Sequence, residues 1–220
     1  MGKGSRKKPK FGFNPKVPKL KVTKLQIAQR EIDTCADLYF SNGDVVSTHL
    51  LISAAHEILA VFDKKFLKTG MFFDHAEQYI KPELLEEFRS LIKAPSIGFK
   101  HGAKDLDTQV ELPWHLNEML MFSAIEKYIE LTKRPTAKML LLRAWIAVHL
   151  QLFTAEGEQM FDFPAIRKQF PAYDREGFRK ALYTDFEKTA RQAAAAAPEA
   201  DILPEIWQQM FPKQPAEKGQ

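Results

Sequence analysis

Apolar residues recur every three or four positions along most of this chain, and that spacing limits the fold more than any other feature. The stretch that begins near Thr23 carries one such set: Leu25, Ala28, Ile32, Cys35, Ala36 and Tyr39. This spacing places the apolar side chains on one face of an α-helix. Only TQVEL, residues 108–112, alternates like a brief strand. The sequence therefore predicts an all-α fold, a bundle of five or six helices.

Turn and capping residues mark the limits of the predicted helices. Asp44, in the turn SNGD, is expected to cap a second helix over about 45–69. That helix is apolar on most of its circumference as far as Asp63, so we expect it to be buried at the centre of the bundle. Gly70 is its expected stop. Pro82 is expected to open a third helix.

Further helices are expected in the C-terminal half. One covers about 114–131, the next begins after a Thr136 cap and reaches about 153, and another covers about 174–196. A short amphipathic segment follows, with apolar residues at i, i+3, i+4 and i+7: Leu203, Ile206, Trp207 and Met210. Two interpretations are open, because this segment can pack on its own bundle or insert into the groove of a partner protein.

Basic residues are concentrated at the N-terminus. Residues 1–24 contain eight lysines, Arg6 and no acidic residue, whereas the remaining 196 residues hold 23 basic and 28 acidic side chains. Little in residues 1–22 could form a core, so we predict a disordered basic tail there, a helical domain over 23–197 and a C-terminal extension over 198–220.

The basic tail has two possible roles. It can neutralise the phosphates of a nucleic acid, or it can only keep the protein soluble. In the first case the expected contacts are the lysines of the tail: Lys7, Lys8, Lys10, Lys16 and Lys19. Phe11 and Phe13 add some capacity to stack on the bases of a single strand.

The compartment is predicted from three absences. Cys35 is the one cysteine, which excludes an internal disulfide and a cysteine-based zinc cluster. The tail lacks the apolar stretch of a secretory signal. The apolar run AWIAVHLQLFTA, residues 144–155, is too short to span a membrane. We therefore expect a cytoplasmic protein without membrane contact.

A polar line on the second helix is a candidate pocket. His49 and His56 share one face because they are seven residues apart, with Ser53 between them and Ser47 and Glu57 nearby. The two histidines would lie about 10 Å apart along the axis, too far to bind one zinc ion without a third element. We predict no metal and no cofactor. The histidines are either buried and hydrogen-bonded or part of a polar line that faces a pocket.

The loop SIGFKHGAKD, residues 96–105, holds several groups that a ribonuclease needs. Lys100 and Lys104 could neutralise phosphate, His101 could transfer a proton near neutral pH, and Asp105 could orient His101. The alternative is an exposed connection whose polar residues only form local caps.

The chain also resembles a group of small uncharacterised bacterial proteins over roughly residues 23–150. The residues that match the motifs of this group are Gly43, Asp44, Val46, Ser47, His49, Leu50, Ala54, Ala55, His56, Glu57, Ile58, Leu59, Phe99, Lys100, His101, Asp105 and Asn117. That group in turn resembles the HEPN superfamily, helical bundles that are often found in toxin–antitoxin and phage-defence systems.

The resemblance implies a specific catalytic motif, and one part of it is missing. Active HEPN ribonucleases carry an arginine and, after four to six intervening residues, a histidine, and the pair meets across a dimer interface. His101 would be this histidine, but Ala94, Pro95 and Ser96 occupy the positions of the arginine. The resemblance therefore implies a homodimer that binds RNA or a nucleotide without strong catalysis. There are two alternatives. One is a metal-independent ribonuclease that uses His101, with Lys100 or Lys104 as substitute cation. The other is a regulatory protein-interaction module.

Overall fold

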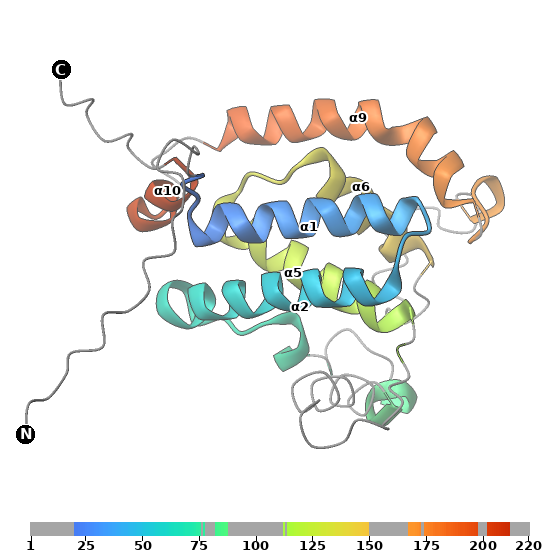
Figure 1. Cartoon of the computed structure of the whole chain (residues 1–220), viewed down its shortest axis with the longest axis horizontal. Coiled ribbons are helices and arrows are strands. Elements are labelled where there is room, and N and C mark those ends of the chain that lie inside the picture. Colours follow the sequence, from blue (N-terminus) through green and yellow to red (C-terminus); the bar gives the residue numbers. More distant parts are fainter. Residues whose placement is uncertain are drawn as a thin grey trace, which may run out of the picture.

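The computed structural model describes residues 20–75, 77, 82–87, 112, 114–149, 167–172, 174–197 and 202–211. The regular secondary structure in these ranges is helical throughout, which confirms the predicted all-α class (Figure 1). The principal helices are α1 (Lys24–Phe40), α2 (Val45–Phe62), α5 (Trp114–Thr132), α6 (Ala137–His149), α9 (Arg175–Ala196) and α10 (Pro204–Met210).

The helices form a bundle around one apolar core. α1 packs between α2 and α6, and α5 packs against α2 from the other side of the core. The long helix α9 lies along the outside of α6, and the short helix α10 lies beside the beginning of α1 (Figure 1). The core includes all six apolar residues that the spacing of the first helix predicted, together with Trp145, Tyr128 and Phe178 as its largest side chains.

Local capping explains where α1 and α2 begin. The Thr23 hydroxyl accepts a hydrogen bond from the Gln26 amide at 3.2 Å, and the Gln26 side chain accepts one from the Thr23 amide at 3.1 Å. Such a reciprocal pair satisfies two amides that no helical carbonyl can reach. The Asp44 carboxylate accepts from the Ser47 amide at 2.6 Å, which confirms the predicted cap of α2.

The C-terminal end of α2 differs from the prediction. The α-helix ends at Phe62 and continues as a π-helix over Asp63–Leu67. Lys68 then adopts a left-handed backbone conformation, with φ at 59°, and ends the helix two residues before Gly70. A glycine is the residue most often found in that conformation, so the sequence placed the stop at the wrong residue.

The prediction that α2 is buried on most of its circumference is wrong. Val46, Leu50 and Val61 are 44%, 54% and 67% exposed. The physical reason is that α1 and α5 cover only part of the helix surface, and an apolar composition cannot show how many neighbours a helix has. The helix over Val45–Leu67 is long and apolar enough to cross a membrane by length and composition, and its most apolar 18-residue window has a mean hydropathy of 1.6 and is 28% buried. The predicted cytoplasmic location stays a prediction.

The C-terminal helices follow their predicted limits. α5 and α9 agree with the expected ranges to within one residue, and Asp174 caps α9 by accepting from the Gly177 amide at 3.0 Å. Thr136 accepts from the Met139 amide at 3.2 Å and so caps α6 as expected. Pro82 opens a 3₁₀ turn, Pro82–Leu84. Residues 85–87 continue as a helix, in agreement with the prediction. The predicted third helix beyond residue 87, the predicted strand except residue 112, and the end of the fifth helix lie outside the described residues.

Candidate functional site

Three polar pairs join α2 to α5 inside the bundle. His49 contacts Asn117, with 2.8 Å between Nδ1 and Oδ1, and His56 contacts Ser123, with 3.0 Å between Nε2 and Oγ. The third pair follows directly after α2, where Asp63 accepts from Lys127. The members on the α2 side are seven residues apart, so they lie on one face. The pairs advance together along both helices, which therefore run parallel.

The hydrogen bonds of Asn117 fix the tautomer of His49. The Asn117 amide nitrogen donates to the Val45 carbonyl at 3.0 Å, so the Asn117 oxygen faces His49 and accepts from Nδ1–H. His49 Nε2 is then an acceptor, and the Ser53 hydroxyl lies 3.4 Å from it. Burial lowers the pKa of His49, although the bond to Asn117 opposes this effect. The imidazole is therefore neutral at pH 7 and oriented by its neighbours.

His56 is also held in its neutral form. Burial lowers the pKa of His56 to about 4, against the opposing charges of Asp74 and Glu57. Its ring stacks on Phe73, with 5.2 Å between the ring centroids. The structure thus shows His49 buried and His56 half-buried, both hydrogen-bonded, which is one of the two interpretations that the sequence left open. Ser47 and Glu57, the other predicted pocket residues, are exposed on the outer side of α2.

Sequence reasoning missed the ion pair between Asp63 and Lys127. The Lys127 ammonium donates to Asp63 at 2.8 Å, to the Thr69 hydroxyl at 2.8 Å and to Glu130 at 2.6 Å. Asp63 also accepts from the Gly70 amide at 3.0 Å. Burial opposes ionisation of Asp63, but the bonds from Lys127, Thr69 and Gly70 outweigh it and lower its pKa. Both side chains are almost fully buried.

Asp63 follows His56 by seven residues, as His56 follows His49, and this spacing could have placed Asp63 on the same helical face, although it gives no indication of Lys127. The pair fixes the turn that follows α2 against α5. In the described part of the chain, no group of three or more histidine, cysteine or acidic side chains could hold a metal ion. The polar face between α2 and α5 therefore consists of neutral imidazoles and one satisfied ion pair.

The C-terminal helix packs on its own bundle. Ile206 is fully buried and Met210 is half-buried, whereas Leu203 is exposed and Trp207 half-buried. The Thr23 hydroxyl donates to the Gln209 carbonyl, and the Gln26 side chain donates to the Met210 carbonyl at 2.9 Å. These contacts join α10 to the beginning of α1, directly after the basic segment.

The other predicted site residues cannot be placed. The loop with Lys100, His101, Lys104 and Asp105 lies outside the described residues, as do the lysines of residues 1–19. The predicted roles of these residues stay predictions.

Comparison with known proteins adds no further constraint. No protein-family model, curated protein or solved structure matches the chain. The resemblance to HEPN proteins therefore stays an expectation.

Proposed function

We propose that this chain is a HEPN-like nucleic-acid-binding protein that binds single-stranded RNA, or a nucleotide, without strong catalysis. The observation that carries the proposal is the charge distribution: residues 1–24 hold nine basic and no acidic side chains, whereas the rest of the chain has more acidic than basic ones. Cations that contact phosphates release counterions, which gives affinity for any nucleic acid.

The position of the first described residues supports this proposal. Lys21 and Lys24, the last cations of the basic segment, are exposed. Thr23, between them, is fixed by the capping box of α1 and by its contact with α10. The last residues of the segment therefore lie beside α10, so a phosphate chain that contacts Lys21 and Lys24 would lie at this end of the bundle.

Two observations support a binding role over strong catalysis. The positions expected for the HEPN arginine are Ala94, Pro95 and Ser96. The described histidines of α2 bond to Asn117 and Ser123 inside the bundle, where a phosphodiester would have to displace core contacts to reach them. The resemblance implies a homodimer, and the absence of a secretory signal predicts the cytoplasm as its compartment.

The experiment compares the full chain with a variant that has glutamine at Lys7, Lys8, Lys10, Lys16 and Lys19. Binding of fluorescent oligouridine is measured by anisotropy at low salt. We expect the variant to bind at least roughly tenfold more weakly, because five cations are removed. Equal affinities of the two proteins would show that the basic segment does not contribute to binding.

The same samples test the second candidate function. The resemblance of the Phe99–Lys100–His101 stretch to its bacterial relatives favours a ribonuclease. Gel analysis of the bound oligouridine would then show cleavage by the full chain and none by a His101→Ala variant. We expect intact RNA with both proteins.

A further inference from the structure

Helix α10 has two apolar sides, of which one packs fully against the bundle and the other packs against it only in part, through Trp207. Ile206 is fully buried, and Met210 follows it on the side that faces the bundle. Leu203, Trp207 and Phe211 succeed each other at intervals of four residues and so lie along another side. Leu203 is 41% exposed and Phe211 47% exposed. One apolar side is enough to dock a short helix, so the outer side needs a different explanation.

An arginine holds the two aromatic rings of this outer side in place. The Arg134 guanidinium lies 4.9 Å from the centroid of the Trp207 ring and 5.5 Å from that of Phe211. The two rings are 4.7 Å apart and inclined by 44°. Arg134 Nη2 donates to the Ala197 carbonyl at 2.8 Å, and its Nε is buried without a hydrogen-bond partner in the structure. Among the described residues, Arg134 forms no ion pair with a carboxylate.

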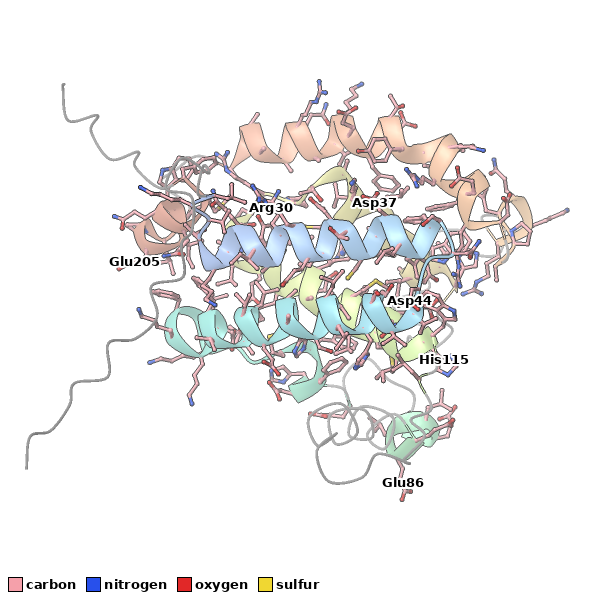
Figure 2. All side chains as sticks on the ribbon, viewed as in Figure 1. Arg30, Asp37, Asp44, Glu86, His115 and Glu205 are labelled. Atoms are coloured by element: carbon pink, nitrogen blue, oxygen red, sulfur yellow. The ribbon has the colours of Figure 1, made fainter. Side chains whose placement is uncertain are left out.

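The surroundings of the rings are basic. The contacts of Thr23 and Gln26 with α10 place the exposed Lys21 and Lys24 at this end of the bundle. Lys133, next to Arg134, is also exposed. Figures 1 and 2 show α10 beside the start of α1, with Glu205 on its outside. Glu205 lies about 160° around the helix from Trp207, so its charge does not face the rings.

We propose that Trp207 and Phe211 form a stacking surface for the bases of single-stranded nucleic acid, whose phosphates Lys21 and Lys24 help to neutralise. This inference rests on the proposed function and adds a second contact with the nucleic acid, the stacking of its bases. Aromatic faces accept any base, and a cation beside them strengthens the contact. The combination of ordered rings with Arg134 and the exposed Lys21, Lys24 and Lys133 favours a polyanion with flat bases over an apolar protein segment.

The experiment uses the full chain and two ligands of equal length, oligouridine and an abasic phosphate chain. Oligodeoxythymidine is included because stacking does not distinguish RNA from DNA. The test variant is Phe211→Ala, and the matched control is Val61→Ala, which removes an apolar side chain of α2 that is more exposed, at 67% against 47%. Phe211→Tyr keeps the ring and serves as the rescue variant.

We expect Phe211→Ala to weaken oligouridine binding about 5- to 100-fold and to leave abasic binding unchanged. Val61→Ala and Phe211→Tyr should bind oligouridine like the unmodified chain. If Phe211→Ala binds oligouridine normally while the five-lysine variant does not, the stacking surface is refuted and the proposed function stands. If the unmodified chain binds neither ligand, both fail. Self-association is measured by size-exclusion chromatography with light scattering. If Phe211→Ala loses self-association while its oligouridine binding is unchanged, the outer side of α10 is a protein interface and the inference is refuted.

Discussion

Replacement of Lys127 by methionine should destabilise the fold more than any other single change at the polar face between α2 and α5. Lys127 and Asp63 are both almost fully buried, and the ammonium is the cation that neutralises the carboxylate, 2.8 Å away. Removal of one partner from a buried pair leaves an uncompensated charge in the interior and costs about 3–5 kcal/mol. Methionine has a similar length, so the loss would not result from a large cavity.

Urea unfolding at pH 7 measures this loss, with Glu130→Gln as the matched control. Glu130 also contacts Lys127, at 2.6 Å, but its side chain is 36% exposed. An exposed ion pair contributes less than about 1 kcal/mol, so the control should change little. A double variant, Asp63→Asn with Lys127→Met, should recover part of the loss because neither charge remains.

The pH dependence of the stability loss distinguishes an uncompensated buried charge from a simple packing defect. The pKa of Asp63 is lowered in the folded protein, so its contribution to stability is present above its ordinary value, near 4, and is lost as the pH falls through the folded value. Without Lys127, burial should raise that pKa, and protonation would then favour the folded state. The loss of stability in the Lys127→Met variant should therefore become smaller as the pH falls from 7 to 4.

Two results would refute this reasoning. The first is a loss below about 1 kcal/mol at pH 7, no larger than that of Glu130→Gln. The second is a deficit that stays constant down to pH 4, which would show that the lost contacts are apolar and that the charge of Asp63 is not involved.

Three further predictions concern single residues. Gly70→Ala should lower the stability of the fold by about 1–2 kcal/mol in thermal unfolding, because φ of Gly70 is 82° and the new Cβ would lie 2.8 Å from His75 Nε2. Lys68→Gly should raise the stability by about 1 kcal/mol. The opposite order of the two variants would contradict the backbone assignment. Burial raises the pKa of Cys35 to about 12, so the thiol should react with a disulfide reagent only after unfolding in urea, and rapid labelling of the native chain would argue against its burial. Since burial lowers the pKa of His56 to about 4, its imidazole NMR signals should titrate near pH 4. The stability of the fold should also fall as the pH drops from about 6.5 towards 4. A titration midpoint near 6.5 would show an open, hydrated ring.

The parts of the fold that sequence reasoning predicted are those that depend on nearby residues. Asp44 and Thr136 cap the helices that follow them, as predicted, because a cap requires only a side chain and an amide three residues later. The buried face of α1 also follows from local spacing. The exposure of Leu50 does not, because it depends on which helices pack beside α2.

The candidate site was harder to predict because its contacts join distant residues. Asp63 and Lys127 are 64 positions apart, and no local pattern links them. In α10 the sequence suggested one apolar face, although the structure separates buried Ile206 from exposed Leu203 and adds Phe211, which lies one residue beyond the helix. Only the packing against α1 shows which side remains outside.

The central claim is that the basic N-terminal segment binds nucleic acid through phosphate contacts, and the salt dependence of oligouridine binding tests it most directly. Each cation that contacts a single strand contributes about 0.7 to the slope of log K against log salt, so the nine cations of residues 1–24 allow a slope of about −6 at most. We predict a steep negative slope for the full chain and a slope shallower by about 3–4 when Lys7, Lys8, Lys10, Lys16 and Lys19 are glutamine. Equal slopes for the two proteins, or a slope near zero for the full chain, would contradict the account.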